Sequence, residues 1–66
     1  PIKERALKRI PRNGNNLYLS FSIADISALQ NLTALEKLGL ENNQISDMRA
    51  LEHLENLTYL DIDGNE

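Results

Sequence analysis

The sequence predicts an α/β solenoid, with a short parallel sheet on a concave face and tight helical returns on a convex face. Three observations predict this fold: apolar residues recur with a period of 22, part of each period alternates apolar with polar residues, and the remainder spaces apolar residues three apart. Alternation is typical of a strand, and steps of three suit a 3₁₀ or one-turn helical return. One such coil cannot bury its apolar side alone, so the coils are expected to stack.

The period is supported at eight positions. The matched pairs are Leu35 and Leu57, Leu38 and Leu60, Leu40 and Ile62, Asn43 and Asn65, Ile23 and Ile45, Ile26 and Met48, Leu29 and Leu51, and Leu32 and Leu54. The resulting frame, L-x-x-L-x-L-x-x-N-x-I with an I-x-x-L-x-x-L tail, resembles the leucine-rich repeat in its short form over roughly residues 16–66. The segments IADISALQNLT and ISDMRALEHLEN are similar to those that recur in internalins. The chain therefore resembles a fragment or truncated form of an internalin-like leucine-rich repeat protein.

Residues 1–12 are basic, with five cations and one carboxylate, whereas the remaining residues carry two cations and nine carboxylates. Ile2, Ala6 or Leu7, and Ile10 lie near one face at helical spacing, and Pro11 with the Asn13-Gly14 pair ends the pattern. We predict a basic amphipathic helix over 1–12, and the resemblance implies that it caps the solenoid. Residues 13–66 are predicted to form about two and a half coils, truncated at the C-terminal side.

The first coil departs from the period. A shift of 22 from Leu38 and Leu40 reaches Asn16 and Tyr18, whereas a shift of 21 reaches two leucines, Leu17 and Leu19. We therefore expect a one-residue deletion in the first turn. Leu17 and Leu19 would then be buried, Tyr18 and Ser20 would point outward, and Phe21 would lie near the position of the missing asparagine.

In the complete coil, Leu38 and Leu40 are predicted to enter the core, and the helical return is predicted to bury Met48, Leu51 and Leu54. Asp47 with Ser46, and Asp25 with Ala24 one coil earlier, are predicted to N-cap the two returns. The resemblance implies a structural role for Asn43 and Asn65, whose amides would hydrogen-bond backbone groups of the turns.

The outward positions of the strands are the predicted partner-binding site, since the resemblance implies that the inner face of such a solenoid is its usual binding surface. They are Tyr18, Ser20, Lys37, Gly39, Glu41, Tyr59, Asp61 and Asp63, with Asn16 as a weaker member. Carboxylates beside two tyrosines would suit a basic protein or peptide. The alternative is that these residues only keep the sheet soluble.

Catalysis, metal binding and a cofactor are not expected. The chain has no cysteine, and its one histidine, His53, falls in a helical return with no evident nucleophile nearby. The run from Asp61 to Glu66 resembles an EF-hand loop only superficially, because an EF-hand has glycine at its sixth position and glutamate at its twelfth. No apolar run approaches the ~20 residues of a membrane span.

Two other functions remain open. The chain could be a structural cap or fragment with no binding of its own, or its basic helix could bind nucleic acid or anionic lipid. The second is disfavoured because that helix is short and lacks aromatic residues. The pattern stops within the third coil, so we expect a continuing chain, a partner or a second copy at the uncapped C-terminal edge. The resemblance implies a bacterial surface or secreted location, and a cytoplasmic location stays open.

Overall fold

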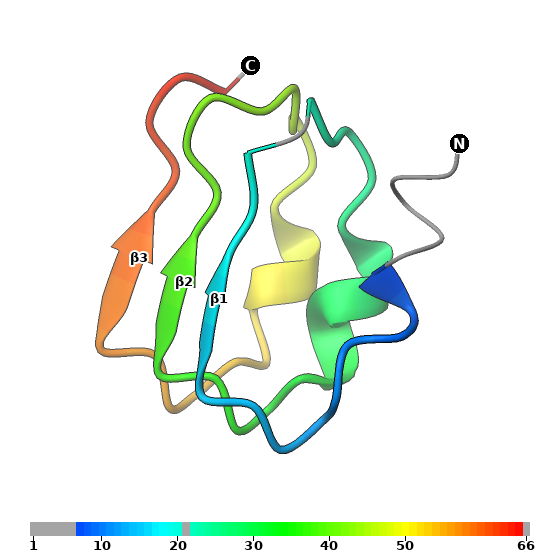
Figure 1. Ribbon diagram of the computed structural model, residues 1–66. Coiled ribbons are helices and arrows are strands. Elements are labelled where there is room, and N and C mark those ends of the chain that lie inside the picture. Colours follow the sequence, from blue (N-terminus) through cyan, green and yellow to red (C-terminus); the bar gives the residue numbers. More distant parts are fainter. Residues whose placement is uncertain (1–6, 21, 66) are drawn as a thin grey trace.

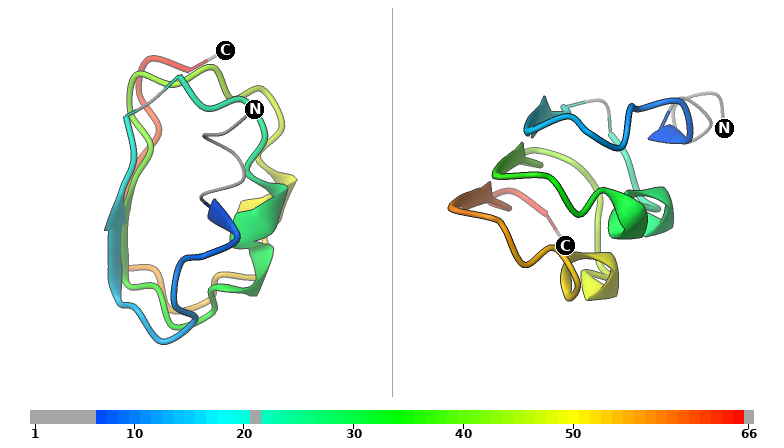
Figure 2. Two further views of the ribbon diagram at one scale, coloured as in Figure 1. Left: turned by 45° about the vertical axis from the view of Figure 1, so that its right-hand side comes forward. Right: turned by 90° about the horizontal axis from the view of Figure 1, so that it is seen from below.

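The computed structural model describes residues 7–20 and 22–65 of the 66-residue chain, and these residues form stacked coils (Figure 1). The elements in chain order are β1 (Asn16–Tyr18), η1 (Ser27–Asn31), β2 (Lys37–Gly39), η2 (Arg49–Leu51) and β3 (Tyr59–Asp61). The strands lie on one side of the stack and the 3₁₀-helices η1 and η2 on the other, as Figure 2 shows. The predicted α/β solenoid is confirmed.

The three strands form one parallel sheet in the order β1-β2-β3. Leu38, at the centre of β2, pairs with Leu17 of β1 and Leu60 of β3. Leu38 is fully buried, whereas Leu60 is 42% exposed because β3 has a strand on one side only. The apolar side chains therefore fill the space between the sheet and the helical returns. The residues next to them in each strand point away from this core.

The pairing of β1 with β2 confirms the one-residue deletion in the first coil. Leu17 pairs with Leu38 and Tyr18 with Gly39, both at a step of 21 residues. Leu19 is buried as predicted, Leu17 is only partly buried, and Tyr18 and Ser20 are exposed. The deletion lies between Leu19 and Ile23, in a turn where Ser22 takes a positive φ of 57°. The predicted position of Phe21 lies outside the described residues.

The helical returns are 3₁₀-helices, as their apolar spacing of three predicts. Leu29 in η1 is fully buried and Leu54 after η2 is buried. Met48 and Leu51 are only half-buried, because the return that contains them packs against a neighbour on one side only. No helix in residues 7–20 and 22–65 is long and apolar enough to cross a membrane.

The predicted N-caps are wrong by one position. The N-cap residues of η1 and η2 are Ile26 and Met48, and neither side chain forms a capping hydrogen bond. In each return, the aspartate one residue before the N-cap accepts the hydrogen bond instead. Asp25 Oδ1 accepts from the backbone N–H of Ser27 at 2.9 Å, and Asp47 Oδ1 accepts from that of Arg49 at 3.0 Å. Each is an Asx turn, in which the carboxylate bonds the N–H two residues ahead.

The hydrophobic core extends from the N-terminal side of the described chain to the second return. Its buried members are Leu7, Leu19, Ile23, Ile26, Leu29, Leu32, Leu35, Leu38, Leu40, Ile45 and Leu54. Leu7 belongs to this core and Ile10 packs against it, but residues 8–12 are not helical, so the predicted capping helix is not confirmed. The rest of the predicted cap, residues 1–6, lies outside the described residues.

Candidate functional site

The outward side of the sheet carries every residue of the predicted binding site, and we call this surface the sheet face. The strand register aligns Asn16, Lys37 and Tyr59 in one row and Tyr18, Gly39 and Asp61 in the next. The third predicted row, just past the ends of the strands, contains Ser20, Glu41 and Asp63. Neighbouring parallel strands are about 4.8 Å apart, so side chains of one row are close enough to contact a single ligand.

Gly39 is buried although it lies in an outward row, because Tyr18 covers it. A Cβ atom on Gly39 would lie only 2.6 Å from Tyr18 Cδ1 and 2.9 Å from Glu41 Oε1. Real Cβ atoms do not approach other heavy atoms so closely, so the absence of a side chain at this position allows the tyrosine ring to rest on the strand. The ring is still 57% exposed and keeps much of its surface available.

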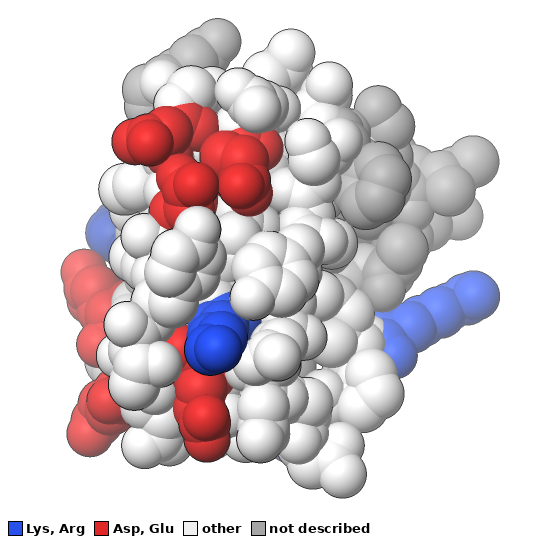
Figure 3. Space-filling model, turned by 60° about the vertical axis from the view of Figure 1, so that its left-hand side comes forward, with Lys and Arg blue, Asp and Glu red and all other residues white. Residues whose placement is uncertain are grey.

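The C-terminal end of the sheet face is acidic. Figure 3 shows acidic side chains gathered over one end of this face, with no basic side chain among them. Asp61 Oδ1 accepts from the backbone N–H of Asp63 at 3.0 Å, and the Tyr59 hydroxyl donates a long hydrogen bond of 3.5 Å to Asp61 Oδ2. The pKa of Tyr59 is raised, mainly by the negative charge of Asp61 and to a smaller extent by burial and by Glu41.

The carboxylates of the sheet face have no cationic partner within the described ranges. The one ion pair that the described residues form joins Arg49 to Asp47, with Nη2 and Oδ2 2.7 Å apart, and both belong to the second return. Glu41, Asp61 and Asp63 therefore leave an uncompensated negative field on the face. Lys37 lies on the same face without forming an ion pair.

Asn43 and Asn65 hold successive turns together. Asn43 is 4% exposed; its Oδ1 accepts from the N–H of Ile23 at 3.0 Å, and its Nδ2 donates to the carbonyls of Leu19 at 2.8 Å and Leu40 at 2.9 Å. Asn65 repeats the pattern with the N–H of Ile45 and the carbonyls of Leu40 and Ile62, at distances between 2.8 and 3.0 Å. Both asparagine side chains hydrogen-bond the backbone, as predicted.

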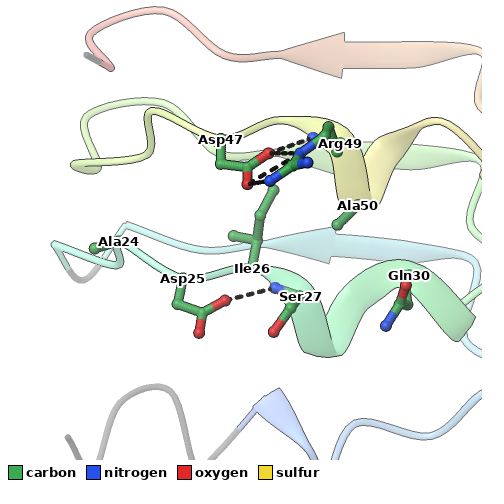
Figure 4. Close-up of a pocket in the computed structure, with 8 residues that line it drawn as sticks. All are labelled: Ala24, Asp25, Ile26, Ser27, Gln30, Asp47, Arg49 and Ala50. Atoms are coloured by element: carbon green, nitrogen blue, oxygen red, sulfur yellow. Dashed lines mark hydrogen bonds and ion pairs between the residues drawn. The ribbon is translucent and has the colours of Figure 1, made fainter.

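A second feature, which the sequence reasoning missed, is a hollow of about 530 Å³ along the two helical returns. Figure 4 shows Asp25 and Asp47 at equivalent places in neighbouring coils, with the Arg49 side chain folded back onto Asp47. That contact lowers the pKa of Asp47 to about 2, and the backbone N–H of Ser27 is the main cause that lowers the pKa of Asp25. The recurrence of aspartate at positions 25 and 47, one period apart, is the sequence signal from which this hollow could have been found.

These aspartates are already used by the fold, since each accepts the first N–H of a return. Within residues 7–20 and 22–65, no group of three His, Asp or Glu side chains is arranged to hold a metal ion. His53 is exposed beside the second return, away from the sheet face. The sheet face is therefore the surface on which exposed aromatic rings and uncompensated charge occur together.

The comparisons with known proteins agree with the fold. The family profile described as leucine rich repeat matches residues 15–66, which is more than half of the chain. The chain belongs to the leucine-rich repeat family. Among curated proteins no match was found. Leucine-rich repeat coils form quasi-one-dimensional scaffolds whose extended surfaces serve protein interaction in general.

Among solved structures, this leucine-rich repeat chain is similar to an internalin, InlF, from Listeria monocytogenes. The two are 37% identical and superpose with a TM-score of 0.68 over 77% of this chain. The match spans 15% of the length of that internalin. The predicted internalin-like character of the repeat is confirmed.

Proposed function

We propose that this leucine-rich repeat chain is a protein-interaction module that presents its sheet face to a basic protein or peptide. The observation that carries the proposal is a combination of features on one three-stranded sheet. Two tyrosines are 57% and 46% exposed, and the carboxylates beside them lack a cationic partner among the described residues. Tyrosine supplies contact area at a low cost in conformational entropy, and complementary charge steers a partner and fixes its orientation.

The short strands favour this use of the face. Their outward side chains have no core to fill, and they project from backbone that is fixed by the sheet and by the asparagine hydrogen bonds. A rigid surface loses little conformational freedom when it binds. On the opposite side of the stack, the described residues include no exposed tyrosine, and Asp47 there is paired with Arg49.

The proposal is tested by selecting binders from a random peptide library and mapping each one on the protein by amide chemical shifts. We expect the selected peptides to be basic and to shift the amides of β1, β2 and β3 rather than those of η1 and η2. The double reversal of Asp61 and Asp63 to lysine should abolish binding, since it replaces attraction with repulsion.

The matched control reverses Glu52 and Glu55 to lysine, because both are exposed and lie by the second return. This control makes the same change in net charge but leaves the sheet face intact, so binding should persist. Equal loss in both double variants would mean that only the net charge of the chain attracts the peptides. Shifts confined to the helical returns, or no binders at all, would refute the sheet face as the binding surface.

A further inference from the structure

Two side chains of the sheet face, those of Tyr18 and Glu41, converge on Gly39, and Tyr59 and Asp61 lie on the neighbouring strand. Tyr18 Cδ1 and Glu41 Oε1 both lie within 3 Å of the place that a Cβ atom of Gly39 would occupy. Asp61 follows Gly39 in the same row, and Tyr59 lies within 3.5 Å of Asp61 through its hydroxyl. The pKa of Tyr59 responds to Asp61, Glu41 and Tyr18, so all four groups share one environment.

We infer that the Gly39 cluster, made of Tyr18, Glu41, Tyr59 and Asp61 around Gly39, binds a guanidinium group, supplied by an arginine side chain of the partner. This inference rests on the proposed function, because it names the residue that anchors a basic partner to the sheet face. The sheet face without this cluster would attract basic partners by charge alone and would not distinguish arginine from lysine.

The geometry of the two tyrosines suits a flat cation. Tyr18 and Tyr59 are two strands and two residues apart, which places their Cα atoms about 12 Å from each other for ordinary strand spacings. Tyr18 leans from β1 over β2, so its ring lies between its own strand and the strand that carries Tyr59. A guanidinium is planar and stacks on aromatic faces, whereas an ammonium is a compact and strongly hydrated point charge.

The carboxylates supply the second half of the site. Glu41 and Asp61 reach the cluster from neighbouring strands, and neither forms an ion pair with a described residue. The five N–H donors of a guanidinium can serve both carboxylates while its plane rests against a ring. Lys37 pairs with Tyr59 across the strands, so its positive charge keeps a bound cation on the side of Gly39 where Glu41 and Asp61 lie.

Tyr18 is already held in the binding position. Its ring rests on Gly39, and this contact reduces the ordering that binding would otherwise require. Gly39 is thus a positioning residue, since any side chain at this place would displace the ring and the Glu41 carboxylate together.

The inference is tested with three small probes at matched ionic strength: N-acetyl-arginine amide, its lysine counterpart, and its citrulline counterpart, which keeps the shape of arginine without the charge. We expect the arginine probe to shift the amides of Tyr18, Gly39 and Asp61. It should bind about two- to fivefold more tightly than the lysine probe, the range of a solvent-exposed cation–π contact. The citrulline probe should give no saturable shift.

A second readout follows from the charge environment. The carboxylates raise the pKa of Tyr59, so a bound guanidinium should lower it again, as measured by ultraviolet absorbance during an alkaline titration. The Tyr18→Leu and Asp61→Asn variants should each weaken the arginine probe while the amide spectrum shows that the fold is retained. The matched control is Glu52→Gln, which removes one carboxylate near the second return and should leave the binding unchanged.

Equal binding of arginine and lysine, or any binding of citrulline to the cluster, would overturn the inference. An arginine probe that gives no shift at Gly39 would also overturn it. The proposed function survives these results if library peptides still map to the sheet face without requiring arginine. If no peptide contacts the sheet face, the proposed function and the inference both fail.

Discussion

The replacement Asn43→Ala tests whether the asparagine hydrogen bonds hold the coils together. The amide of Asn43 makes three short hydrogen bonds, between 2.8 and 3.0 Å, in a position that is 4% exposed. Each such bond contributes about 1 kcal/mol, and a buried donor left without a partner costs about 1–3 kcal/mol. The variant should therefore lose about 3 kcal/mol of unfolding free energy.

That loss is large for a chain of this size. A 66-residue domain is stabilised by roughly 3–10 kcal/mol in total, from about 0.05–0.15 kcal/mol per residue. The unfolding free energy is measured by urea titration monitored with far-UV circular dichroism. If Asn43→Ala is already partly unfolded in buffer, a titration with the osmolyte TMAO restores the folded baseline and yields the same quantity.

The control is Asn65→Ala, because Asn65 makes the same set of bonds in the last turn of the described chain, where it is only half-buried. Water can replace the lost amide there, so this variant should lose about 1 kcal/mol. Equal losses in the two variants would refute the argument that burial sets the cost. A loss below about 1 kcal/mol for Asn43→Ala would refute the structural role itself.

Three further predictions concern the backbone, the second return and the core. Gly64→Ala should lose about 1–2 kcal/mol in the same urea assay, because Gly64 has a φ of +74°, which alanine rarely adopts. Gly14→Ala is its control and should change stability by less than about 0.5 kcal/mol, since the nearest atom to the new Cβ is 3.5 Å away. Arg49→Gln should raise the pKa of Asp47 from about 2 toward 3.8, as measured by carboxyl NMR. The present contact stabilises the fold above pH 3.8, and that contribution is lost as the pH falls toward 2. Leu38→Ala should lose about 2–5 kcal/mol, because its side chain is fully buried.

Each of these predictions has an outcome that would contradict it. A neutral Gly64→Ala would mean that the turn can relax to an ordinary φ. An unchanged pKa in Arg49→Gln would show that the backbone N–H alone depresses the carboxylate. A small loss for Leu38→Ala would mean that the two flanking strands close over the cavity.

Much of the fold could be predicted from the sequence because its signal is periodic. The apolar alternation predicted that Leu38 points into the core. The register of the first strand followed from the shift of 21 residues, which aligns Leu17 with Leu38. The rows of the sheet face followed from that register without further information. A one-residue error would have moved every side chain to the opposite face.

The Gly39 contact could not be predicted, because it depends on the direction in which the Tyr18 side chain leans across to the next strand. Sequence spacing fixes the face on which a residue lies but not its side-chain rotamer. The N-caps were misplaced for a related reason: whether Asp25 and Asp47 occupy the N-cap or the preceding position depends on backbone angles, and the sequence pattern is the same in both cases.

The asparagine hydrogen bonds give the solenoid a direction. Asn43 bonds the backbone of Ile23 and Leu19, which belong to the coil before it, and Asn65 does the same for Ile45 and Leu40. A coil is thus completed by its successor, which emerges later during synthesis. Such a chain can fold progressively as it is made, and each new turn fixes the one already formed.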